Sequence, residues 1–411
     1  MRNALLLALM ALSAPLAAQA ARGGGWGDEL APVVVPERLI AIGPRLGEPV
    51  EWPAPPLRRP PSPVRALYVN AWAFGGSRFR ELLSLADSTE VNSLVIDIKD
   101  DTGYLTYRSE VPTAVSIGAN GQLRARDAAE RLRQLHLKGI HPIARIVVAK
   151  DPLLAARKTA WSVKDRNGGL WHDRLDFAWV DAYNDSVWIY AAQLAEEAVH
   201  MGFGEIQFDY VRFPDEPQSR MATAIFAARR PGESTRDGVK RGLSILRDRV
   251  RPLGVPYTID VFGMTTNVEV DLGIGQVWED LVTVADVVLP MVYPSHYYHP
   301  MYGVKRPNSD PYRIVRGALE DGVRRSSRIA GPSAEIRPYL QAFTLGAPRY
   351  TPDLVRTQIQ AARDAGIHGW VLWNPRSVYD PRIFAPGNPA GAAQLSERAG
   401  APRTPEREAS R

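Results

Sequence analysis

The chain has 411 residues, of which 45% are hydrophobic, with a formal net charge of +5 at pH 7 and no cysteine. This length allows one large domain or two ordinary ones. The absence of cysteine excludes thiolate catalysis, zinc–thiolate sites and iron–sulfur clusters. Because the mild basic balance comes without a dense Lys/Arg run, we expect no nucleic-acid partner and at most weak attraction to acidic envelope polymers.

The first twenty residues have the pattern of a secretory signal. Arg2 precedes an apolar run over residues 4–12, and the segment closes with Ala-Gln-Ala at residues 18–20. The run is shorter than the ~20 apolar residues that span a bilayer. We therefore expect cleavage after Ala20, a secreted or periplasmic protein, and no stable membrane insertion after cleavage.

Two further segments have compositions that oppose regular structure. Residues 21–63 form a proline-rich leader, with ten prolines between residues 32 and 63, and proline disfavours both helix interiors and sheet ladders. Residues 386–411 contain almost no large apolar side chains and are predicted to be a disordered tail. The folded domain is expected over residues 64–385.

Short β-branched runs alternate with longer amphipathic runs in this domain. Predicted strands cover residues 65–71, 93–99, 141–148, 205–211, 257–262, 287–292, 337–343 and 369–373. Predicted helices lie between them, over residues 79–88, 125–138, 185–200, 235–251, 277–284, 312–324 and 352–365. This repeated alternation predicts an α/β fold whose parallel sheet closes as a (β/α)8 TIM barrel, with an open doubly wound sheet as the alternative. No glycine-rich phosphate loop follows the first strand, and we expect no cofactor.

Carboxylates lie where a TIM barrel has its functional groups, at the C-terminal ends of the strands. Asp209 ends the apolar run "EIQF", where an ionised carboxylate is costly unless it is paired or used in chemistry. Gln207 shares a face with Asp209, as Asp97 does with Lys99, because side chains alternate along a strand. Asp209 and Asp260 on neighbouring strands would face one cavity, which is the arrangement that glycoside hydrolysis requires.

Other polar and aromatic residues at the strand ends suit a sugar, because rings stack on its apolar faces while polar groups bond its hydroxyls. The candidate substrate-binding residues are Asp97, Lys99, Gln207, Tyr210, Arg212, Tyr293, His296, Gln341 and Trp373. For several of these residues, roles other than sugar binding remain open. Asp97, Lys99 and Arg145 also suit a buried ion network, and His296 begins an H-x-x-H spacing that we do not interpret as a metal site. The long connection over residues 151–185, with three tryptophans, is a candidate substrate-binding loop.

Several motifs, in this order, resemble a family of glycoside hydrolase-like barrels first catalogued as a domain of unknown function. They include "VIDIKDDTGYLTY", "GEIQFDYVRFP", "YTIDVFGM", "LPMVYPSHY" and "GWVLWNP". The resemblance implies a TIM barrel and, through more distant similarity to α-amylase-like barrels, Asp209 as nucleophile and Asp260 as acid/base. Gln207 stands where those barrels have arginine, and Asp260 where they have glutamate.

Together these features predict an exported glycoside hydrolase-like barrel that cleaves a polysaccharide or cell-envelope glycan with two carboxylates. The alternative is a non-catalytic carbohydrate-binding barrel of the cell envelope. A third hypothesis is a metal-assisted hydrolase that uses Asp97, Asp100 and His296.

Overall fold

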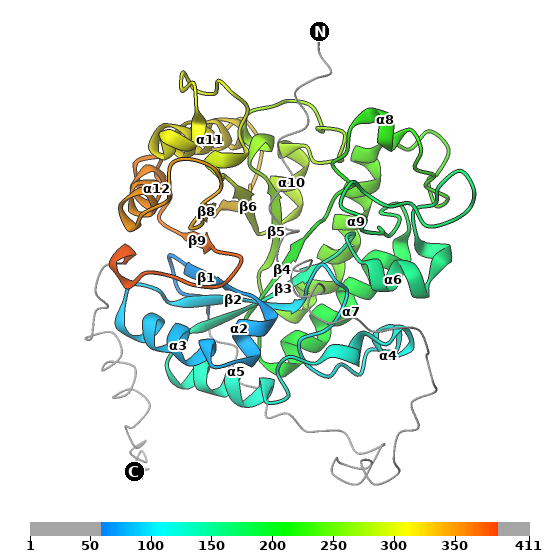
Figure 1. Ribbon diagram of the computed structural model, residues 1–411, viewed down its shortest axis with the longest axis horizontal. Coiled ribbons are helices and arrows are strands. Elements are labelled where there is room, and N and C mark those ends of the chain that lie inside the picture. The colour runs from blue at the N-terminus through cyan, green and yellow to red at the C-terminus, as the bar shows by residue number, and fades with distance from the viewer. Residues whose placement is uncertain (1–58, 385–411) are drawn as a thin grey trace, which may run out of the picture.

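The computed structural model describes residues 59–384 (Figure 1). The expected signal segment, leader residues 21–58 and the tail at 386–411 lie outside the described residues. None of the helices between residues 59 and 384 is long and apolar enough to cross a membrane.

The strands form one parallel sheet that closes on itself. They are β1 (Arg65–Val69), β2 (Ser93–Lys99), β3 (His141–Val147), β4 (Glu205–Asp209), β5 (Tyr257–Phe262), β6 (Val287–Met291), β7 (Glu335–Ile336), β8 (Tyr339–Gln341) and β9 (Trp370–Trp373). Their order is β5-β4-β3-β2-β1-β9-β8-β6-β7, and pairing of β5 with β6 closes the ring. The predicted TIM barrel is therefore confirmed, and the open-sheet alternative is wrong.

The seventh strand position is the one that differs most from its prediction. The sequence predicts one strand over residues 337–343, whereas the structure has two short strands, β7 and β8, on either side of Pro338. Proline has no N–H to donate to a ladder, so it interrupts the strand. The carbonyl of Pro338 still accepts from Val371 N at 2.9 Å, and Arg337 N donates to Val288 O at 3.0 Å, which keeps the barrel closed.

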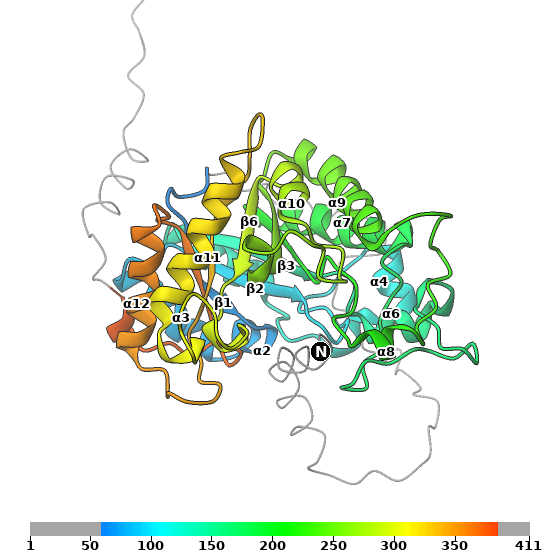
Figure 2. The ribbon, with the colours of Figure 1, turned by 90° about the horizontal axis from the view of Figure 1, so that it is seen from above.

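Helices surround the strands (Figure 1). They are α2 (Ala71–Gly75), α3 (Arg78–Ser88), α4 (Pro112–Ile117), α5 (Ala128–Leu137), α6 (Pro152–Arg157), α7 (Asp185–Met201), α8 (Gln218–Met221), α9 (Thr235–Val250), α10 (Trp278–Val284), α11 (Pro311–Ser326) and α12 (Pro352–Asp364). When the barrel is turned by 90°, α11 and α12 lie on one side of the strands and α7 and α9 on the other (Figure 2). All seven predicted helices are present.

Local sequence signals explain where the long helices begin. Ser234 and Asp237 form a capping box at the start of α9, and the Thr351 hydroxyl accepts from Leu354 N at the start of α12. Both satisfy backbone N–H groups that the first turn of a helix leaves unpaired. Gly202, with φ 110°, ends α7 in the left-handed region that glycine tolerates.

Alternation along the strands separates the core into two layers. Ile206 and Phe208 of β4 face the helices in the larger cluster, while Val95 of β2 lies in the smaller cluster inside the barrel. Side chains alternate along a strand, so Asp97, two residues after Val95, points into the barrel, and so does Gln207, which lies between Ile206 and Phe208. Polar side chains therefore enter the barrel from its C-terminal half, where the candidate site lies.

Candidate active site

Asp209 and Asp260 occupy corresponding positions on neighbouring strands. The register of β4 and β5 pairs Phe208 with Ile259, so the next residue on each strand is one of the two aspartates. Adjacent strands lie about 4.8 Å apart. Both side chains line the same pocket, as the sequence analysis expects.

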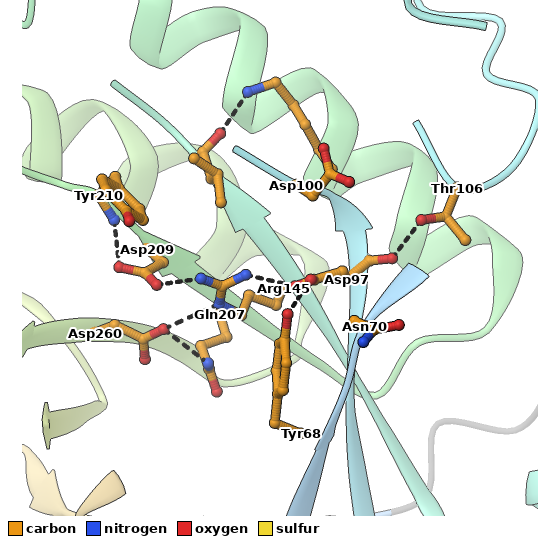
Figure 3. A network of polar contacts seen from close by, with 12 residues as sticks. Tyr68, Asn70, Asp97, Asp100, Thr106, Arg145, Gln207, Asp209, Tyr210 and Asp260 are labelled. Atoms are coloured by element: carbon orange, nitrogen blue, oxygen red, sulfur yellow. Dashed lines mark hydrogen bonds and ion pairs between the residues drawn. The ribbon is translucent and has the colours of Figure 1, made fainter. Parts of the chain in front are cut away.

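One arginine joins these carboxylates to a third. Arg145 of β3 stands opposite Asp97 in β2 and opposite Gln207 in β4. Its guanidinium pairs with Asp97 and with Asp209, and its Nε lies 3.5 Å from Oδ2 of Asp260. Figure 3 shows Arg145 between Asp97 and Asp209, with Gln207 beside Asp260.

Neutral side chains complete the network. The hydroxyl of Tyr68 donates to Oδ2 of Asp97 at 2.5 Å. Gln207 Nε2 donates to Oδ2 of Asp260 at 3.0 Å and to the hydroxyl of Tyr339 at 2.6 Å. Oδ1 of Asp260 is buried and has no hydrogen-bond partner within the part of the chain that the structure describes. A buried acceptor in this state is costly, and in this pocket it is free to bind a ligand.

The cluster holds three carboxylates and one cation, so full ionisation would leave an excess of two negative charges in a buried site. Burial and the neighbouring Asp209 carboxylate raise the pKa of Asp260 well above its ordinary value, although Arg145 opposes them. Burial raises the pKa of Asp97 to about 6, against the effect of Arg145 and Tyr68. Asp260 is therefore the carboxyl most strongly driven to hold a proton, while Asp209 keeps an arginine partner.

The pocket lies beside these carboxylates at the C-terminal ends of the strands. Its volume is about 130 Å³, which is room for several water molecules at about 10–15 Å³ each. Its lining combines the acidic pair with arginines and aromatic rings. The lining residues are Arg145, Asp209, Tyr210, Arg212, Asp260, Phe262, Gly263, Met264, Met291, Tyr293, His296, Tyr297, Tyr339 and Trp373.

Packed aromatic rings form one wall. Tyr293 stacks on Trp373 with ring centroids 5.3 Å apart and an interplanar angle of 21°, and Phe343 meets both rings edge-on. Gly263 lets the chain after β5 approach the end of β6 closely, because a Cβ there would lie 2.4 Å from the carbonyl oxygen of Met291. A flat, rigid apolar wall beside polar groups suits a sugar ring.

Five of the candidate substrate-binding residues line this pocket: Tyr210, Arg212, Tyr293, His296 and Trp373. Asp97 and Gln207 lie behind it, in contact with Arg145 and Asp260 rather than on its surface. Gln341 is fully buried, and its Oε1 accepts from the Ser295 backbone N–H at 3.1 Å. Gln341 thus orders the loop that carries His296 without lining the pocket.

Lys99 is also away from the pocket, for a reason visible in the strand ladder. The register between β2 and β3 shifts between Asp97 and Lys99, so the two side chains do not share a face as period two predicts. Lys99 Nζ instead pairs with Asp151 at 2.7 Å and lies over the ring of Tyr190 in α7. The expectation of a shared face is wrong, and the structure gives Lys99 a buried ion pair.

Other pocket residues are missing from the sequence candidates. Phe262 and Met291 line it as the last residues of β5 and β6, the position that marks the other candidates, whereas Tyr339 lines it as the first residue of β8. In the long loop over residues 151–185, Trp171 and Trp179 are buried, so neither ring is exposed as a binding surface. Trp179 instead packs against Tyr210 and Arg212, which line the pocket.

The metal hypothesis finds no geometric support in the described part of the chain. Between residues 59 and 384 no group of three or more His, Asp or Glu side chains is arranged to hold a metal ion. Asp100 accepts from the Thr102 backbone N–H at 3.0 Å, and His296 Nδ1 lies 2.9 Å from the Ser295 hydroxyl.

Solved structures with a similar fold include two glycoside hydrolases. The PgaB (BpsB) glycoside hydrolase domain from Bordetella bronchiseptica has a TM-score of 0.52 at 14% identity, covering 77% of this chain and 95% of that one. A chitobiase from Flavobacterium johnsoniae has a TM-score of 0.50 at 11% identity, covering 82% of this chain and 50% of that one. At these identities the likeness concerns the fold.

A hypothetical protein from Ruminiclostridium thermocellum is 37% identical over 44% of this chain and 91% of its own, with a TM-score of 0.41. A search of the curated proteins found no match. Residues 66–379, which are more than half of the chain and include all of the barrel strands except the first residue of β1, match the profile described as "Putative glycosyl hydrolase domain" (DUF4015), and the chain belongs to that family.

Proposed function

We propose that this protein is an exported glycoside hydrolase that cleaves a polysaccharide or cell-envelope glycan, with Asp209 as nucleophile and Asp260 as proton donor. The observation that carries the proposal is the contrast between two neighbouring carboxylates in one pocket. Arg145 pairs with Asp209, whereas burial and Asp209 raise the pKa of Asp260. A carboxyl group with a raised pKa is suited to donate a proton, and a neighbouring carboxylate that is paired with an arginine is suited to act as nucleophile.

The first step transfers the glycosyl group to the enzyme. The ionised Asp209 attacks the anomeric carbon, the bond from that carbon to the glycosidic oxygen breaks, and the leaving oxygen takes the proton of Asp260. Neighbouring strand positions favour the short carboxyl separation, about 5–5.5 Å, of a retaining enzyme.

The second step restores both groups. Once Asp209 is esterified it no longer carries the charge that helps to raise the pKa of Asp260, so Asp260 is then stabilised as a carboxylate. It removes a proton from water, the water oxygen attacks the anomeric carbon, and the ester bond to Asp209 breaks. Arg145 contacts both aspartates, and it stabilises whichever of them is ionised.

The decisive experiment is Asp209→Asn, because this change keeps the side-chain shape and removes the nucleophile. We expect loss of turnover on a panel of nitrophenyl glycosides and polysaccharides, with the melting temperature and sugar binding retained. Asp364→Asn on α12 is the control, because that exposed carboxylate bonds Tyr312 and lies outside the pocket. A 2-fluoro glycoside should leave a covalent adduct on Asp209 in the wild-type protein, which mass spectrometry locates. Full activity of Asp209→Asn would refute the assignment.

A second function has one observation in its favour. Only 6% of Asp209 and 1% of Asp260 is exposed, so a substrate has to reach carboxylates that are nearly covered, and a binding barrel would not need to reach them. A glycan that binds tightly without product after long incubation would favour this carbohydrate-binding function.

Export is tested separately. If the signal is cleaved after Ala20, N-terminal sequencing of the protein recovered from the periplasm or medium should begin at Ala21. Recovery of a protein that still carries residues 1–20 would contradict cleavage after Ala20.

A further inference from the structure

The pocket contains a second arginine that forms no ion pair with any carboxylate in the described part of the chain. Arg212 follows β4 by three residues, lines the pocket and is 5% exposed. Its Nη1 donates to the carbonyl oxygen of Phe213 at 3.0 Å. Among residues 59–384, no Asp or Glu oxygen lies within ion-pairing distance of this guanidinium.

Aromatic rings hold the guanidinium in place. Its central carbon lies 4.6 Å from the ring centroid of Phe262, 4.8 Å from that of Tyr210 and 5.4 Å from that of Trp179. Cation–π contacts of this kind stabilise a guanidinium and fix its plane. They do not provide the paired acceptor oxygens to which an arginine fork donates.

The charged groups around Arg212 leave it available. Asp209 is paired with Arg145. Asp215, on the loop after Arg212, has its pKa raised by burial and opposed by Arg212 and Arg174, but it forms no ion pair with Arg212 among the described residues. A buried charge without a partner is costly unless a ligand supplies one.

Two other polar atoms of the same pocket lack protein partners. Oδ1 of Asp260 and the hydroxyl of Tyr297 are both buried and form no hydrogen bond with residues 59–384, and both residues line the pocket with Arg212. A carboxyl oxygen, a hydroxyl and a cation that have no such partner among residues 59–384, all in one cavity, indicate a ligand that carries hydroxyl groups and an anion.

We propose that Arg212 binds an acidic group, a carboxylate or a sulfate or phosphate ester, on the sugar residue that occupies this pocket, so that the substrate is an acidic glycan. This inference rests on the proposed function and names its substrate class. The cation also offsets the repulsion between an acidic sugar and the Asp209 carboxylate next to it.

The test measures binding instead of turnover, so that it succeeds or fails independently of the catalytic assignment. Wild-type protein is titrated with glucuronate, glucose 6-sulfate and glucose 6-phosphate, and with the neutral probes glucose and methyl glucuronate, followed by NMR. We expect at least one acidic sugar to bind about 10- to 100-fold more tightly than its neutral counterpart, the range of a charge-assisted hydrogen bond. Its preference among the three acidic probes identifies the acidic group.

Variants assign the effect to the residue. Arg212→Met should abolish the preference for the acidic sugar, and Arg212→Lys should retain part of it, because lysine keeps the charge but not the planar fork. Arg316→Met is the control, because it removes an equal charge from α11 and Arg316 does not line the pocket. This variant should keep the preference for the acidic sugar.

The outcomes are distinct. Equal binding of acidic and neutral sugars by the wild-type protein would overturn the inference without any variant, even if Arg212→Met fails to fold. A preference that survives in Arg212→Met would also overturn it. Acidic-sugar binding by a protein that cleaves no glycan would support this inference while refuting the proposed function.

Discussion

Replacing Arg145 with glutamine should destabilise the protein in a manner that depends on pH. The guanidinium pairs with Asp97 and Asp209 inside the barrel, and removing one partner of a buried ion pair costs about 3–5 kcal/mol. Burial already raises the pKa of Asp97 to about 6 although Arg145 opposes it. Without the arginine, the pKa of Asp97 must rise further, because its main opposing charge is gone.

The sign of the pH dependence follows from proton uptake. Because the variant's folded state binds protons more tightly than its unfolded state, its free energy of unfolding falls as pH rises through the raised pKa values. We therefore expect the full loss at pH 8. At pH 5 the loss should be smaller by at least about 1 kcal/mol, since a pKa change of one is worth about 1.4 kcal/mol.

Urea unfolding followed by tryptophan fluorescence at the two pH values measures both quantities. Arg316→Gln is the matched control, because this arginine pairs with Glu320 on the exposed face of α11 and should leave the free energy of unfolding nearly unchanged. A loss below about 1 kcal/mol at pH 8, or an equal loss at both pH values, would refute the view of Arg145 as the charge centre of the barrel.

Two further predictions concern Lys99 and His296, two of the candidate substrate-binding residues. Lys99→Met leaves the fully buried Asp151 unpaired, so unfolding free energy should fall by about 3–5 kcal/mol with KM unchanged; a raised KM at unchanged stability would instead make Lys99 a substrate ligand. Burial lowers the pKa of His296 to about 4, so between pH 6.5 and 4 only the unfolded state takes up its proton and stability falls with falling pH. His296→Asn should remove that decline in urea titrations, and an unaltered decline would contradict the assignment.

The barrel and its acidic pair could be predicted from sequence because both depend on local patterns. The hydrophobic periods of strands and helices predict that the two kinds of element alternate along the chain. In a TIM barrel the functional residues lie at the C-terminal ends of the strands, so their positions can be located before their roles are known. Asp209 and Asp260 satisfy both criteria, and the structure places them in one pocket.

The remaining features depend on how strands are aligned, which no local pattern specifies. Period two places Lys99 beside Asp97, but the register shift between them separates the two side chains. The sequence suggests Arg145 as an ion-pair partner of Asp97, but only the register shows that it stands between two strands, opposite both Asp97 and Gln207. Likewise, the lack of a carboxylate partner for Arg212 is a property of the folded loop, and the motif "FDYVRFP" does not reveal it.

The interruption at Pro338 has a consequence for motion in the barrel. Five register pairs join β5 to β6, from Thr258–Val287 to Phe262–Met291, whereas β6 and β8 are joined through Met291–Tyr339. Local unfolding begins where strands are joined by the fewest hydrogen bonds. Amide hydrogens of β8 should therefore exchange with solvent sooner than those of β3. Tyr339 of β8 also lines the pocket, so local opening of β8 would transiently enlarge the pocket. A bound sugar that contacts both Tyr339 and Arg145 would therefore slow hydrogen exchange in β8.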